Sequence, residues 1–143
     1  MNPTEAYLVQ TRAVTQDVLN LGIVRTHFFA TPLKLGNQLI AGGWPMDQSP
    51  SSRLLTVANG YTGANSASRA DRIMIWNGDA TSGTTGYVSH YLLKTATLEK
   101  WVRSGDAQLA SENNLPLFKA MRGVYFNAYI AKPNVVSPCP WTP

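Results

Sequence analysis

The heptapeptide Val124-Tyr125-Phe126-Asn127-Ala128-Tyr129-Ile130 decides the fold class of this chain. Apolar residues stand at every second position and alternate with two tyrosines and an asparagine. A period of two is that of a β-strand with one face in a core and the other face turned outward. We therefore predict buried side chains at Val124, Phe126, Ala128 and Ile130, and outward side chains at Tyr125, Asn127 and Tyr129.

Short runs of β-branched and aromatic residues fill the rest of the chain, and Gly, Pro and Asn separate them about every ten residues. The stretch Ala107–Met121 is the one place suited to a helix, around Gln108–Glu112, and Pro116 limits its length. We expect an all-β fold, an antiparallel β-sandwich or barrel-like domain with at most one or two short helices. The predicted strands are Ala6–Val14, Val18–His27, Lys34–Ala41, Leu54–Ala58, Arg72–Trp76, Tyr87–Lys94, Leu98–Arg103 and Val124–Ala131.

Length and composition agree with a single β domain over residues 1–143. Apolar residues make up 44% of the chain, whereas charged residues make up only 14%, against roughly 25% in ordinary soluble domains. Low charge with normal hydrophobicity is the opposite of the pattern of a disordered chain. No apolar run approaches the ~18 residues of a membrane span, so we expect none.

The net charge of +4 does not predict a nucleic-acid partner, because the basic residues are scattered. The densest pair, Arg69 and Arg72, has Asp71 between its members. Phosphate neutralisation needs several Lys or Arg side chains on one face. We therefore expect no nucleic-acid binding.

Motifs of catalysis are missing from the sequence: neither G-x-S-x-G nor a glycine-rich phosphate loop occurs. His27 and His90 lack the spacing of a zinc site, and each is expected to be a satisfied core or interface histidine. We predict no enzyme activity, no cofactor and no metal. Cys139, the single cysteine, is interpreted as a small apolar residue, with an intermolecular disulfide or a reactive thiol as the alternatives.

Residues 1–30 differ from the rest of the chain, because they form a long β-prone segment with little turn chemistry and few charges. Such a strand at an open edge would aggregate, so it must pair inside its own domain or with a neighbouring subunit. The second alternative makes residues 1–30 a partner-pairing segment. Two tryptophans in irregular segments would add contact area. The predicted subunit-interface residues are Tyr7, Val9, Leu19, Leu21, Ile23, Trp44 and Trp141.

Tyrosines on two predicted strands suggest a ligand face. If these strands are neighbours, Tyr87, Tyr91, Tyr125 and Tyr129 form one surface patch, which could stack on sugar rings. Trp44, Trp76, Trp101 and Trp141 could add to such a sugar-stacking platform; the alternative for Trp76 and Trp101, at the ends of strands, is that they close the core.

Several motifs carry a resemblance to a known group of proteins. They are Gly43-Trp44-Pro45-Met46-Asp47-Gln48-Ser49-Pro50, Val57-Ala58-Asn59-Gly60-Tyr61, Ala70-Asp71-Arg72-Ile73-Met74-Ile75-Trp76, Tyr91-Leu92-Leu93-Lys94, Trp101-Val102 and Pro140-Trp141. Together they resemble β-rich secreted proteins of environmental bacteria that carry no assigned activity. The resemblance covers residues 40–143 and implies an extracellular, non-enzymatic role. It leaves the first 40 residues uncovered.

These observations lead to two hypotheses. The first is a structural subunit that self-assembles into an extracellular fibre or surface layer, its N-terminal strand completing a neighbour's sheet. The alternative is a carbohydrate-binding β-sandwich module that uses the tyrosine and tryptophan patch. A viral shell protein shares the assembly logic of the first hypothesis. The start Met1-Asn2-Pro3-Thr4 shows no signal peptide, so the chain is either cytoplasmic or a mature exported form; its sparse charge favours a location outside the cell or at its surface.

Overall fold

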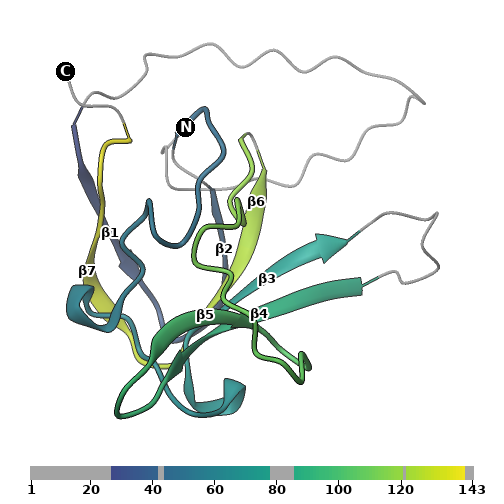
Figure 1. Ribbon diagram of the computed structural model, residues 1–143. Helices are drawn as coiled ribbons and strands as arrows, with labels where there is room; N and C mark the ends of the chain where they lie inside the picture. The colour runs from purple at the N-terminus through teal and green to yellow at the C-terminus, as the bar shows by residue number, and fades with distance from the viewer. Residues whose placement is uncertain (1–26, 42–43, 78–85, 121, 141–143) are drawn as a thin grey trace.

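The computed structural model describes residues 27–41, 44–77, 86–120 and 122–140. It shows an all-β fold of two antiparallel sheets. Five strands form the larger sheet in the order β2-β6-β3-β4-β5, and two strands form the smaller sheet, β1-β7 (Figure 1). The strands are β1 (Phe29–Leu33), β2 (Gly36–Ala41), β3 (Arg72–Asn77), β4 (Gly86–Lys94), β5 (Glu99–Arg103), β6 (Gly123–Ala128) and β7 (Lys132–Ser137).

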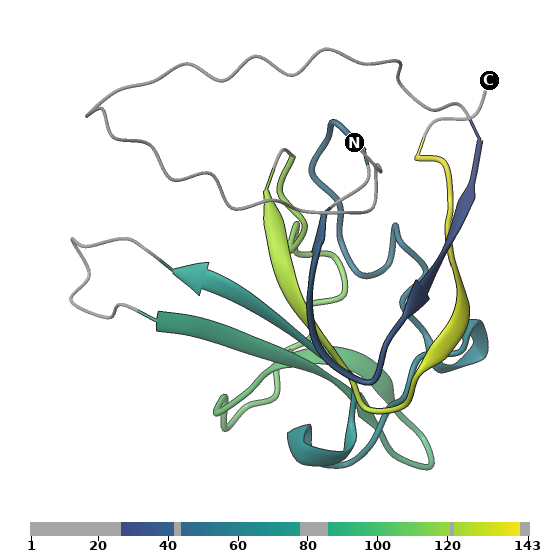
Figure 2. The ribbon, with the colours of Figure 1, turned by 180° about the vertical axis from the view of Figure 1, so that it is seen from behind.

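The two sheets are connected by chain segments that pass from one to the other at two corners. β1 continues into β2 across residues 34–35, and β6 continues into β7 across residues 129–131. β2 pairs with β6 and β1 pairs with β7, so the two corners lie next to each other (Figure 2). Gly36 begins β2 with a φ of +89°, a left-handed conformation that glycine adopts without a steric cost.

The main core lies between the sheets. β3 and β6 contribute Ile73 and Phe126 from the larger sheet, and β1 and β7 contribute Leu33 and Val135 from the smaller one. Trp101, which is 1% exposed, donates its indole N–H to the Leu55 carbonyl at 2.8 Å. The alternative that Trp101 closes the core is therefore confirmed.

Among the described residues, the opposite, outer face of the larger sheet is covered at one end. There Tyr91, Leu93 and Val102 pack with Ala70 into a second buried cluster, against which Leu109 also packs. Both faces of β4 are thus buried near its carboxyl end, whereas its amino end keeps an open outer face.

The alternation that fixed the fold class is confirmed over most of β6. Val124, Phe126 and Ala128 are 1–3% exposed and face the core. The prediction for Ile130 is wrong: this residue is 56% exposed, because β6 ends at Ala128 and the chain turns toward β7.

Predicted strands inside the larger sheet agree with β2, β3, β4, β5 and β6. The predictions over Ala6–Val14 and nearly all of Val18–His27 lie outside the described residues. The last two residues of the predicted partner-pairing segment belong to β1, where Phe29 and Ala30 pair with Ser137 and Val136 of the same chain.

The strand predicted over Leu54–Ala58 is wrong. Ser49 and Ser52 exchange bonds between hydroxyl oxygens and backbone N–H groups (2.9 and 3.1 Å), and these bonds hold the preceding chain in tight turns. Leu54 has a φ of +54°, and a 3₁₀ turn, η1 (Val57–Asn59), follows. Leu55 of this segment nevertheless packs in the main core and is 3% exposed.

The helix predicted around Gln108–Glu112 is also wrong. The Asp106 carboxylate accepts bonds from the backbone N–H groups of Gln108 (3.0 Å) and Ala110 (2.9 Å), and Leu109 has a φ of +48°. These two backbone bonds lower the pKa of Asp106. In the described part of the chain, helical structure is confined to η1 and a second 3₁₀ turn, η2 (Ala67–Arg69).

Candidate functional site

Three aromatic side chains meet on the outer face of the larger sheet, and we call Trp76, Tyr87 and Tyr125 the aromatic platform. Trp76 of β3 lies opposite Tyr87 of β4, with ring centroids 5.1 Å apart and an interplanar angle of 64°. The Tyr87 ring also contacts Tyr125 of β6, at 5.4 Å and 82°. Both contacts have the edge-to-face geometry that aromatic rings prefer. Trp76 is 58% exposed and Tyr87 is 51% exposed.

The exposure of the platform follows from the pairing of β3. β6 pairs only with Arg72–Met74, whereas β4 pairs with the whole of β3. The far part of the β3–β4 hairpin therefore diverges from β6, as the two projecting strands in Figure 1 show. Trp76 and Tyr87 lie on this extension, away from the cluster that covers the other end of the same face.

The surroundings of the platform are mostly polar and uncharged, and Arg72 lies farther along β3 on the same face, opposite Asn127. Asn127, two residues after Tyr125, donates its side-chain N–H to the Asn37 Oδ1 atom at 2.6 Å. Ser89 follows Tyr87 by two residues on the same face. Desolvation, and then the nearby Tyr125 phenol, raise the pKa of Tyr87, so its hydroxyl stays neutral at physiological pH.

Two of the four tyrosines of the predicted ligand face are brought together. Tyr87 and Tyr125 are in contact, although β3 separates their strands. Tyr91 is only 7% exposed and lies in the second buried cluster, so it takes no part in an open face. Tyr129 is 43% exposed but follows the end of β6.

For Trp76 the sequence leaves two alternatives, a place in a surface aromatic platform and a place in the core, and its exposure excludes the second. A signal was present in the sequence. Trp76 ends one predicted strand and Tyr87 begins the next, so antiparallel pairing of the two strands places these residues opposite each other.

Most of the predicted subunit-interface residues, namely Tyr7, Val9, Leu19, Leu21, Ile23 and Trp141, lie outside the described residues. Trp44 lies within them and is 4% exposed. A tryptophan so deeply buried within its own chain offers little area to a neighbour, so the fold does not present Trp44 as a surface contact.

The edges of the sheets differ in how they are protected. At β5, Asn113 Oδ1 accepts the Trp101 N–H (2.7 Å) and the Glu112 N–H donates to the Trp101 carbonyl (2.8 Å), so the segment 112–113 caps this edge. β1 and β7 carry Pro32 and Pro133, which cannot donate to an added strand. β2 has neither charge nor proline, and among the described residues it pairs only with β6.

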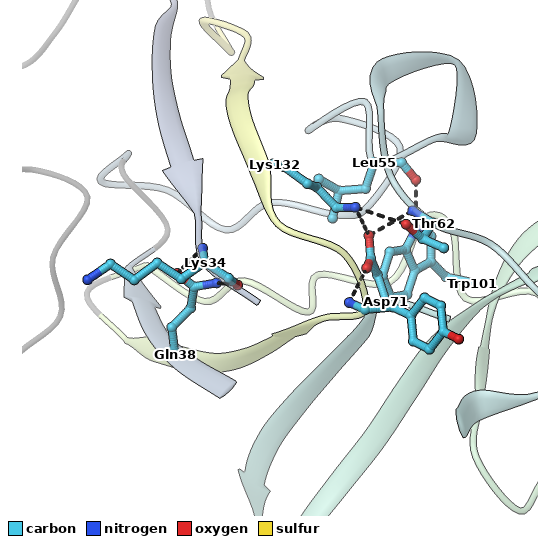
Figure 3. Close-up of polar contacts among 8 residues, drawn as sticks. Lys34, Gln38, Leu55, Thr62, Asp71, Trp101 and Lys132 are labelled. Carbon is cyan, nitrogen blue, oxygen red and sulfur yellow. Dashed lines mark hydrogen bonds and ion pairs between the residues drawn. The ribbon is translucent and has the colours of Figure 1, made fainter. Parts of the chain in front are cut away.

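A buried ion pair ties β3 to the β6–β7 corner (Figure 3). Lys132 Nζ lies 3.0 Å from Asp71 Oδ2 and donates to the Thr62 hydroxyl, also at 3.0 Å. Asp71 is completely buried and accepts the backbone N–H groups of Thr62 and Tyr129, each at 2.8 Å. Because both oxygens of the carboxylate are engaged, we interpret the pair as structural.

A second buried cation packs nearby. Arg53 donates to the Ser137 hydroxyl at 3.2 Å, and its guanidinium carbon lies 4.2 Å from the centroid of the Phe118 ring. Burial lowers the pKa of Arg53 to about 10, and burial raises the pKa of Tyr61 well above its usual value. These contacts join the loop after Pro50 to β7 and to the Phe118 segment.

The histidines occupy different environments. His90 is 5% exposed, and its Nδ1 atom contacts the Glu112 carboxylate, which confirms the prediction of a satisfied buried histidine. His27 is exposed, so the core alternative is wrong for that residue. Its role in an interface stays a prediction.

Small-molecule and metal sites are weakly developed in the described ranges. A shallow hollow of about 220 Å³ lies between Asn59, Thr62, Ile130 and Pro133, with Lys132 in its lining. Within those ranges, no three His, Cys, Asp or Glu side chains gather as a metal site would need.

No helix among the residues described is both long and apolar enough to span a bilayer. No model of a protein family matches the chain, and no curated protein or solved structure is significantly similar to it. The resemblance to secreted proteins of environmental bacteria therefore stays a prediction, as do the absence of enzyme activity and the extracellular location.

Proposed function

We propose that this protein is a structural subunit that assembles by strand addition, with β2 as the acceptor edge. The observation that carries the proposal is the difference between β2 and the other sheet edges. A six-residue strand without charge or proline lacks the devices by which proteins prevent edge-to-edge pairing. The capped β5 and the proline-bearing β1 and β7 have such devices.

The side chains of β2 also favour an added strand. Ile40 packs against the main core but remains partly exposed, as does Leu39 on the outer face. A strand hydrogen-bonded along β2 would cover both residues. Strand addition obtains its affinity from main-chain bonds and its specificity from alternate side chains.

We propose the segment Ala6–Val24 of a neighbouring copy as the donor. In the sequence, Leu19, Leu21 and Ile23 occupy one face of a predicted strand, and a run of this kind could extend the core beside Ile40. Because donor and acceptor are different surfaces, the contact is head-to-tail and continues into a filament unless its rotation closes. The low charge of the chain suits assembly at a cell surface or outside the cell.

Electron microscopy of negatively stained protein, together with size-exclusion chromatography and light scattering, tests this proposal. We expect filaments or sheets from the unaltered chain, and their loss in Leu39→Lys, which places a charge on the acceptor edge. Leu98→Lys is the matched control, since Leu98 is 40% exposed beside the capped edge at β5. The donor is tested by Leu19→Asp combined with Leu21→Asp.

Each outcome bears on a separate part of the mechanism. Assembly that survives the two donor substitutions would rule out Ala6–Val24 as the donor, and assembly that survives Leu39→Lys would rule out β2 as the acceptor. A monomer of about 15.6 kDa from the unaltered chain would contradict polymerisation under those conditions. Closed shells would keep the strand contact but replace the open filament with a closing rotation.

A further inference from the structure

We propose that the aromatic platform binds an uncharged polysaccharide, with Trp76 and Tyr87 stacking on its sugar rings. This function is separate from assembly, because the stacking rings of Trp76 and Tyr87 lie on the outer face of the β3–β4 hairpin, whereas strand addition uses the backbone edge of β2.

The rings are held in place before any ligand arrives. Tyr87 lies between Trp76 and Tyr125, and each contact is edge-to-face at 5.1 or 5.4 Å. Side chains that are already ordered lose little conformational entropy on binding. Trp76 nevertheless keeps 58% of its surface exposed and Tyr87 keeps 51%. Large, ordered and exposed aromatic rings are suited to the apolar face of a pyranose ring.

The exposed area fits a sugar chain better than a protein partner. A large aromatic side chain presents about 150–250 Å² in all, so the exposed halves of Trp76 and Tyr87 amount to roughly 200 Å². A standard protein interface needs about 800 Å² from each partner. Because Trp76 and Tyr87 are each more than half exposed, their rings form open surface. An open surface suits an extended chain, which can lie across both rings.

The charge and polarity of the surface identify the class of polysaccharide. The direct neighbours of the platform rings on the outer face, Leu39, Met74 and Ser89, carry no charge. Arg72 lies on the same face farther along β3, opposite Tyr91 and Asn127, and is only partly exposed. A phosphate-bearing or uronic-acid polymer would need cations here. The amide pair of Asn127 and Asn37, at 2.6 Å, and the Tyr87 hydroxyl supply donors and acceptors near the rings. Aromatic faces with neutral hydrogen-bonding groups complement an uncharged sugar.

Affinity electrophoresis and pull-down with defined polymers test the proposal. The probes are cellulose, chitin, xylan and hydroxyethyl cellulose as uncharged polymers, and alginate and heparin as anionic ones. We expect at least one uncharged polymer to bind and neither anionic one to do so. Trp76→Ala and Tyr87→Ala should each weaken binding about tenfold or more, as loss of a central aromatic contact does. Tyr129→Ala is the matched control, because Tyr129 is exposed but lies outside the platform.

Intrinsic fluorescence supplies a second readout. Trp44 and Trp101 are buried, whereas Trp76 is exposed, so polymer binding should shift tryptophan emission and Trp76→Phe should remove most of the shift. Circular dichroism checks that each variant is folded. Binding should persist in Leu19→Asp combined with Leu21→Asp, the donor variant of the assembly test, which separates this function from assembly. The proposal is overturned if no uncharged polymer binds. It is also overturned if binding survives Trp76→Ala combined with Tyr87→Ala, or if these two substitutions abolish self-association and leave polymer binding unchanged.

Discussion

Asp71 and Lys132 show how a chain with few charges uses two of them inside the fold. Lys132→Met should lower the free energy of unfolding by about 3–5 kcal/mol, because it leaves a fully buried carboxylate without its cation. Urea denaturation measures this change. Lys119→Met is the control: its pair with Asp47 is about half exposed on both sides, and breaking it should cost no more than about 1 kcal/mol. Equal losses in the two variants would contradict a structural role for the buried pair.

Tyr61 makes stability depend on alkaline pH. In the unfolded chain its phenol ionises near pH 10, whereas burial keeps it protonated in the folded protein. Above that pH the folded state holds the additional proton, so the stability that Tyr61 contributes falls as pH rises. Between pH 9 and pH 11 the unaltered protein should lose about 1 kcal/mol more than Tyr61→Phe.

Denaturation at several pH values in this range measures the two slopes. Arg53, whose pKa is lowered to about 10, titrates in the same range in both proteins, so the difference between them reports Tyr61 together with its charge interaction with Arg53. Parallel slopes would mean that Tyr61 ionises in the folded state as readily as in the unfolded chain.

At the scale of elements, the sequence does not predict β1 and β7 as strands, because each of them contains a proline. Thr31-Pro32 and Lys132-Pro133 look like chain breakers, yet they lie within β1 and β7. Proline is tolerated there because the two strands form a two-stranded sheet, in which each has an unpaired side, and because the register shifts between Thr31 and Leu33. The sequence does not reveal which strands lie at an edge, so it does not predict edge strands that contain a proline.

The Asn113 side chain protects the edge of β5 from added strands, because its Oδ1 atom accepts the Trp101 N–H. Asn113→Leu should remove the bond to the Trp101 N–H, leave that buried donor unsatisfied and cost about 1–3 kcal/mol. Hydrogen exchange of the Trp101 amide should accelerate by more than that of the β3 amides. Asn114→Leu, a change at the exposed neighbouring residue, is the control. An unchanged Trp101 exchange rate in Asn113→Leu would show that the segment 112–113 does not protect the β5 edge.

At the scale of the whole molecule, the candidate site was predictable only in part. Alternation correctly placed Tyr87 and Tyr125 on outward faces, because a period of two is a local property of the sequence. It could not reveal that a loop covers Tyr91 on the same face, or that the β3–β4 hairpin diverges from β6 and exposes Trp76. Both facts depend on the order of strands and on which end of the sheet is covered, and neither can be predicted from a local sequence pattern.

The two sheets should unfold as one unit, because they share the main core. Val135 of the smaller sheet packs in the same cluster as Ile73 and Phe126 of the larger one. Val135→Ala should therefore cost about 1–3 kcal/mol and reduce the exchange protection of amides in β3 and β6 by the same free energy. Val136→Ala is a matched control, since that neighbouring valine is 49% exposed and should change stability by less than about 0.5 kcal/mol. If Val135→Ala loosened β1 and β7 while β3 and β6 kept their full protection, the smaller sheet would be an independent unit, and a neighbour could open it without disturbing the platform.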